Sequence, residues 1–350
     1  MRAVLGLALW EWFKLQRRWM LWILLAFAIL FGQLAIWGSY VSYRDLERTG
    51  GEVIVPAALQ QPPTGRPRTV ACSDLLSDDP ARQPEGVGDT ALLALRFQCQ
   101  QQAALLPDRL QRAYERFTLP GSVDNALGTL QTLGLILMAI LVASAIGIDY
   151  GTGTLRSVLI QGTGRWPYLA AKLLALCVVA ALGLVVACAT VAASSLVAAS
   201  LATDAAAVRA PTSATWGEAG AELWRSWTSF LPYLTFTALV TILARSSAAG
   251  MAIGLGYYFA EQIAVALLST LFSWFQNVAD LLLVRNISAW LGGGGFGPGA
   301  SALPDQTHAL VVLSAYTLAM GALAFWLFER RDVQGPTAVS YTHLTLPTKA

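Results

Sequence analysis

Long apolar runs with at most one charged residue each alternate along this chain with polar segments that carry most of its charge. Each run is long enough for a helix to cross the hydrocarbon core of a bilayer, which takes about 20 residues (range about 17–25). A helix also satisfies its own backbone hydrogen bonds, as lipid requires, and the roughly ten-residue alternation of a membrane barrel is missing from the sequence. The pattern therefore predicts an all-α integral membrane protein.

Six runs are long enough to be transmembrane helices. They cover residues 19–40, 122–148, 168–201, 227–243, 251–272 and 307–328. The fourth is the weakest, because Pro232 lies near its start and removes a backbone donor. Composition supports a membrane protein, since 55% of the residues are hydrophobic and 13% are charged, whereas soluble domains carry about 25% charged residues.

Residues 1–18 precede the first run and are expected to form a helix that lies in the membrane interface. Glu11, Lys14 and Arg18 recur at helical spacing, and neighbouring aromatic residues add the apolar surface that such a helix needs. The simpler alternative is a positively charged flank. A cleavable signal peptide is not expected, because the apolar run that follows is too long for a signal core.

The distribution of Lys and Arg orients the six helices, since cytoplasmic loops carry the excess of these residues. With both termini in the cytoplasm, the basic residues on that side are Arg2, Lys14, Arg17, Arg18, Arg156, Arg165, Lys172, Arg245, Arg330 and Arg331. The remaining cytoplasmic segments are then 149–167, 244–250 and 329–338. We therefore predict a multi-pass protein with both termini inside.

Residues 41–121 form the largest segment expected outside the membrane. The segment is rich in Pro and Gln at first and helix-like from Thr90 to Phe117, and we expect it to fold as a small cap. Cys72 and Cys99 lie on this oxidising side of the membrane, so they are a candidate disulfide pair. Two free thiols are the alternative.

Two further outer segments are expected, a loop at 202–226 and an interfacial or re-entrant segment at 273–306. The glycine-rich tract of the latter lacks the Gly-Lys-Ser or Gly-Lys-Thr of a phosphate-binding loop, so a flexible outer loop is predicted. Residues 339–350 resemble the translation of a sequencing adapter, and we exclude them from the interpretation of the fold.

The polar segment 149–167, between the second and third runs, is expected to be a hinge. Its glycines, Gly151, Gly153 and Gly162, allow sharp turns. Its arginines offer forked donors to acidic or carbonyl groups of a partner, and the acidic residue at its start is placed to brace the turn. The alternative is that the basic residues only set the topology.

Residues 145–172 resemble the cytoplasmic segment of the permeases of ABC-2 type ABC transporters. The residues that carry the resemblance are Asp149, Tyr150, Gly151, Thr152, Leu155, Arg156, Gly162, Arg165 and Lys172. The resemblance implies the permease subunit of an ATP-driven exporter in the plasma membrane of a bacterium. It also implies that the hinge couples to a separate ABC ATP-binding subunit, which holds ATP and Mg²⁺, and that a second permease copy or a paralogue is present.

Candidate catalytic chemistry is missing from the sequence. Once the adapter-like end is set aside, His308 is the remaining histidine, and no second His or Cys pair completes a metal or nucleophile set. No G-x-x-x-x-G-K-[ST] motif occurs, so ATP is not expected to bind to this chain. We expect no enzyme activity, no cofactor or metal in this chain, and no nucleic-acid partner.

Glu261 and Gln262 are polar residues inside the fifth run, where a charge costs about 3 kcal/mol. Glu261 should face protein or water, either in substrate passage, as a protonatable switch, or in a structural hydrogen bond. A secondary transporter that uses Glu261 for proton coupling is therefore one alternative function. A non-transporting sensor or anchor that binds through the cap is another. Gly250, Gly254 and Gly256 suggest that this helix packs closely against a neighbour.

Overall fold

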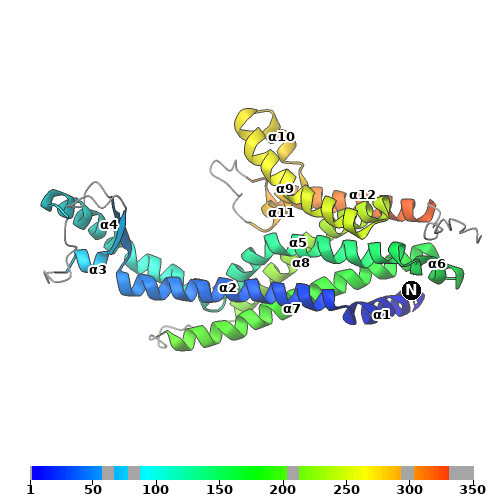
Figure 1. Cartoon of the computed structure of the whole chain (residues 1–350), viewed down its shortest axis with the longest axis horizontal. Helices are drawn as coiled ribbons and strands as arrows, with labels where there is room; N and C mark the ends of the chain where they lie inside the picture. Colours follow the sequence, from blue (N-terminus) through cyan, green and yellow to red (C-terminus); the bar gives the residue numbers. More distant parts are fainter. Residues whose placement is uncertain (1, 57–66, 78–86, 203–212, 293–302, 331–350) are drawn as a thin grey trace, which may run out of the picture. The chain divides into compact units, whose positions relative to one another are not determined.

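A computed structural model describes residues 2–56, 67–77, 87–202, 213–292 and 303–330. The expectations for the glycine-rich tract after Gly292, for the tail beyond Arg330 and for the adapter-like end fall outside these residues. The described chain is mostly helical (Figure 1).

Six helices of the described chain are long and apolar enough to cross a bilayer, as the six runs predict. They are α2 (Trp19–Thr49), α5 (Gly121–Gly151), α7 (Arg165–Leu201), α8 (Ser213–Ala244), α9 (Ser247–Leu271) and α12 (Gln306–Arg330). The prediction of an all-α membrane protein with six candidate spans is confirmed. The fourth helix differs most from its predicted range, because α8 begins at Ser213 and continues through Pro232.

The chain divides into two compact units. One contains residues 1–27, 131–184 and 223–350, and the other contains residues 28–130 and 185–222. Because the boundaries fall inside long helices, α2, α5, α7 and α8 each contribute to both units.

The core of the second unit forms where α2, α5 and α7 meet the end of α4 (Asp89–Phe117). Ile36, Phe117 and Val191 are fully buried in it. Tyrosine rings of α2 and α4 pack edge-on against Phe117. The hydroxyl of Ser195 donates to the carbonyl of Phe117 over 2.8 Å. Phe117 therefore fixes the end of α4 to α7 within this unit.

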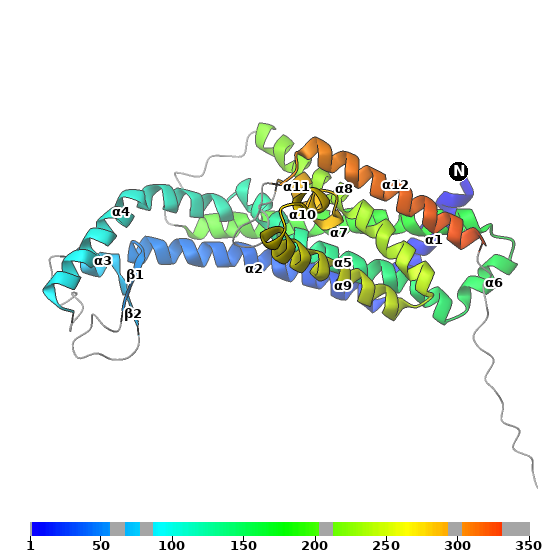
Figure 2. The same ribbon diagram turned by 90° about the horizontal axis from the view of Figure 1, so that it is seen from above.

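The outer cap expected from residues 41–121 contains a small sheet as well as helix. β1 (Glu52–Val55) pairs antiparallel with β2 (Arg68–Ala71), and α3 (Cys72–Leu75) and α4 complete the cap (Figure 2). The sequence analysis does not predict this sheet, because strands of four residues are too short to show a clear alternation. α4 agrees with the helix-like stretch from Thr90 to Phe117.

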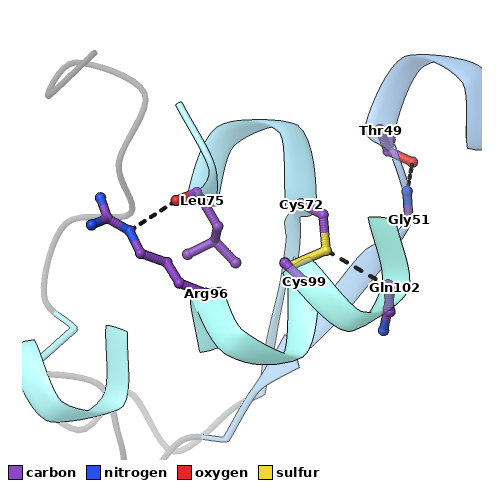
Figure 3. The surroundings of a disulfide bond; sticks show 7 residues. All are labelled: Thr49, Gly51, Cys72, Leu75, Arg96, Cys99 and Gln102. Carbon is purple, nitrogen blue, oxygen red and sulfur yellow. Dashed lines mark hydrogen bonds between the residues drawn. A yellow bond between two sulfur atoms is a disulfide. The ribbon is translucent and has the colours of Figure 1, made fainter. Parts of the chain in front are cut away.

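A disulfide joins Cys72 of α3 to Cys99 of α4 (Figure 3). Both cysteines are buried in the core of the cap together with Val53 and Leu75. The side chain of Arg96 donates to the carbonyl of Leu75 over 3.0 Å and holds α3 beside α4. A core this small is typically supported by a covalent link.

In the first unit, small residues let α5, α8 and α9 approach closely. A side chain at Gly250 of α9 would collide with α8 and would lie 3.1 Å from Cβ of Ala143 in α5. At Gly254 the nearest atom would be Cβ of Ala139, also at 3.1 Å. Gly256 faces open space. Two of the three glycines predicted to pack closely therefore do so, and Gly256 does not.

Replacing Cys72 and Cys99 with alanine removes a link between positions 27 residues apart. We expect the cap to lose about 3–4 kcal/mol of stability, since the open chain regains loop entropy. Limited proteolysis of membranes should then cut within residues 41–121 about tenfold faster or more. Replacing Cys177, a free thiol outside the cap, should have no effect. Equal proteolysis of the three proteins would contradict this prediction.

Gly250→Ala should lower the apparent melting temperature of the detergent-solubilised protein, because overpacking a close helix contact costs about 1–3 kcal/mol. Gly256→Ala is the matched control on the same helix and should leave the melting temperature unchanged or slightly raised, since alanine favours helix more than glycine. The same decrease in both variants would show that helix packing at Gly250 is not the cause.

Candidate coupling site between α5 and α7

The predicted hinge contains a short surface helix between two turns. α5 ends at Gly151, α6 covers Thr154–Ile160, and α7 begins at Arg165. Gly153 before α6 and Gly162 after it have φ angles of 69° and 86°, which glycine adopts without strain. Gly151 is still helical. Two of the three predicted turn glycines therefore make the turns.

Asp149, Tyr168 and Lys172 form a buried polar cluster where α5 and α7 meet. Each residue is at most 3% exposed. The ammonium of Lys172 donates to the carboxylate of Asp149 and lies 3.2 Å from the Tyr168 hydroxyl. That hydroxyl also donates to Asp149. The structure thus brings Asp149 and Lys172, at opposite ends of the motif, into direct contact.

The N-terminal helix α1 (Arg2–Gln16) adds a second carboxylate to this cluster. Glu11 is 3% exposed, and its Oε2 lies 3.7 Å from Nζ of Lys172. Its Oε1 lies 2.5 Å from Nζ of Lys14. Two carboxylates and two ammonium groups therefore meet and compensate each other, as buried charges require. Ion pairs join α1, α5 and α7 at this cluster, which we call the inner charge cluster.

The sequence analysis does not identify Glu11 or Tyr168 as members of a site. It assigns Glu11 to the polar face of an interfacial helix, although the residue stands between Trp10 and Trp12. An acidic residue in an aromatic stretch is a signal for a buried partner. Tyr168 could have been noticed because it precedes Lys172 by four residues and shares its helix face.

α6 presents charged and apolar side chains outward while one residue anchors it. Leu155 is 1% exposed, whereas Ile160 is 74% exposed and Arg156 is also exposed. The hydroxyl of Thr154 donates to Asp149 over 3.3 Å. The surface helix is therefore connected to the inner charge cluster at its first residue.

Other residues of the motif have partners within the chain. Arg165 donates to the carbonyl of Glu329, near the end of α12, over 2.7 Å. Thr152, which follows the last residue of α5, donates to the carbonyl of Ile148 over 2.8 Å, and Tyr150 is half-buried. Of the three basic residues in the motif, Arg156 is the one whose side chain is exposed.

The two polar residues predicted inside α9 have different surroundings. Glu261 is 5% exposed, and its Oε1 accepts a hydrogen bond from the backbone N–H of Arg285 over 2.7 Å. The amide of Gln262 donates to the hydroxyl of Tyr258, on its own helix, over 3.4 Å. The structure thus shows a hydrogen bond for Glu261 within the protein, one of the roles considered for it.

Within the described ranges, no group of three or more His, Cys, Asp or Glu residues could hold a metal ion. His308 lies near the start of α12, with Nε2 3.0 Å from the carbonyl oxygen of Asp280. Cys177 and Cys188 are separate free thiols on α7. The charged groups at the candidate site are therefore the buried ion pairs and the exposed Arg156 of α6.

Comparison with protein families identifies one family for most of the chain. A family model described as ABC-2 family transporter protein matches residues 5–333. This range includes the hinge, the inner charge cluster and Glu261. No curated protein matches the sequence. The chain therefore belongs to the ABC-2 family of transporter proteins, in which its six candidate spans support the role of a permease.

Proposed function

We propose that this chain is the permease subunit of an ATP-driven exporter and that a separate ABC ATP-binding subunit drives it. ATP and Mg²⁺ would bind to that subunit, and a second permease copy or a paralogue would complete the transporter. Membership of the transporter family supports the permease role. The observation that carries the coupling to an ATPase is the surface helix α6, which exposes Arg156 and Ile160.

α6 has the properties of a contact surface for a partner. The guanidinium of Arg156 is a forked donor suited to a carboxylate, and the largely exposed Ile160 adds apolar area on the same short helix. The buried side chain of Leu155 anchors α6 to the protein, and the hydroxyl of Thr154 connects the helix to Asp149. A partner that binds α6 would therefore bind a surface that is held in place.

Movement of α6 would be transmitted to α1, α5 and α7 through the inner charge cluster. Asp149 belongs to α5, Lys172 to α7 and Glu11 to α1. Separation of these helices would break buried ion pairs, and leaving one such charge without its partner costs about 3–5 kcal/mol. We therefore expect the three helix ends to move together when the ATPase moves α6.

If the chain is such a permease, we expect the hinge and both termini in the cytoplasm of a bacterium, because ATP is available on that side of the plasma membrane. Proton-coupled transport through Glu261 is less favoured, since its carboxylate already accepts a backbone N–H within the chain. A non-transporting sensor or anchor is less favoured because the family is one of transporters.

Arg156→Ala should reduce the amount of ATP-binding subunit that co-purifies with the tagged permease by tens-fold. Truncating an arginine that pairs with a desolvated carboxylate of a partner costs about 2–5 kcal/mol. Arg17→Ala is the matched control, because Arg17 is also exposed and the change in charge is the same. The measurement is the ratio of ATPase to permease after purification from membranes of the host, at matched permease abundance.

Equal ratios for Arg156→Ala and Arg17→Ala would show that Arg156 only contributes to topology. Purified permease that performs ATP-driven transport in vesicles without any second subunit would contradict the proposed function itself.

A further inference from the structure

The short helix α11 (Leu283–Trp290) is buried although it contains polar residues. It follows α9 and α10 (Phe275–Ala279), and it contacts α9 and α12 (Figure 1). Arg285 and Asn286 of this helix are 7% and 0% exposed. A buried helix of this kind needs partners for its polar side chains and for the backbone amides of its first turn.

The first turn of α11 is not capped by its own N-terminal residue. Leu282 occupies the N-cap position, and its apolar side chain cannot accept a hydrogen bond. Glu261 of α9 takes over this function, because its Oε1 accepts from the amide of Arg285 over 2.7 Å. A carboxylate at a helix N-terminus also interacts favourably with the helix dipole.

Other polar residues of α11 have partners in the turn before the helix and in neighbouring helices. The guanidinium of Arg285 pairs with Asp280 over 3.2 Å, and Asn286 donates to two carbonyls of the turn before α11 over 2.8 and 2.7 Å. Tyr316 of α12 donates to a carbonyl of that turn over 3.1 Å. Trp290 donates to a hydroxyl of α8 over 3.1 Å. Glu261 therefore supplies a buried hydrogen bond between α9 and the first turn of α11.

We propose that Glu261 is a positioning residue for transport: as the N-cap of α11 it holds α11 against α9, so that the two helices move as one. This function requires an acceptor oxygen with the right reach, and the interaction of the negative charge with the helix dipole is secondary. The link to transport rests on the proposed permease function, whereas the position of α11 does not.

Two substitutions separate the reach of the acceptor from its charge. Glu261→Gln keeps an oxygen at the same distance along the side chain and removes the charge. Glu261→Asp keeps the charge and withdraws the carboxylate by one C–C bond, about 1.5 Å. If Glu261 acts as the N-cap of α11, glutamine should preserve the position of α11 and aspartate should not. Proton coupling predicts the opposite order for transport.

The position of α11 can be measured by the reactivity of a cysteine introduced at Ser288, which is half-buried. The parent protein for this test carries alanine at Cys177 and Cys188, the free thiols. A small maleimide is added to open membrane fragments, so that it reaches both sides and the result does not depend on topology.

We expect Glu261→Gln to label within about threefold of the parent, and Glu261→Asp and Glu261→Ala to label about tenfold faster or more, because a buried donor is left without its acceptor. Gln262→Ala should label like the parent, since Gln262 bonds to its own helix. If Glu261→Ala does not accumulate in membranes, the order of the glutamine and aspartate variants decides.

Parent-like labelling of Glu261→Asp together with rapid labelling of Glu261→Gln would contradict the N-cap role of Glu261. Equal labelling of all variants would contradict it as well. ATP hydrolysis by the complex purified with its ATPase should follow the same order, with glutamine active and aspartate impaired. An active aspartate variant and an inactive glutamine variant would also overturn the proposal. If no ATPase is recovered while the labelling order holds, the N-cap role of Glu261 is supported and the proposed function is contradicted.

Discussion

The arrangement of the helices around the hinge depends on the ion pairs that balance the charge of one buried ammonium group, that of Lys172. Lys172 is 2% exposed, and an unpaired charge in such surroundings costs several kcal/mol, about 3–5 when one partner is removed. Asp149 and Glu11 approach it from α5 and α1. Because the two carboxylates belong to different helices, their ion pairs with Lys172 fix both α1 and α5 to α7.

The six membrane helices could be predicted from the sequence, because lipid imposes both the length and the composition of a span. Their ends could not. α2 continues to Thr49 and α8 begins at Ser213, so both helices extend beyond their apolar runs. Backbone hydrogen bonds can continue a helix outside the lipid, where its side chains no longer need to be apolar. The four-residue strands of the cap were missed because they depend on pairing with each other and on burial in its core.

The site could be predicted in part. The hinge residues were identified by their resemblance to a family pattern, but the contact of Asp149 with Lys172 was not, because the intervening chain folds into two turns and a helix before it returns. Glu261 was noticed as a charge in an apolar run. Its partner was not predicted, because a backbone amide leaves no side-chain signal in the sequence. Polar residues can thus be located from sequence more readily than the groups that satisfy them.

The most direct test of the account is a double-mutant cycle between Asp149 and Lys172, with the ATPase recovered per permease as the measurement. Lys172→Met alone leaves the buried carboxylate of Asp149 without a cation, so it should reduce recovery strongly, at a cost of about 3–5 kcal/mol. Lys172→Met combined with Asp149→Asn leaves Glu11 paired with Lys14 and should restore most of the recovery. If the two substitutions act additively, or if Lys172→Met alone has no effect, the inner charge cluster does not position α6.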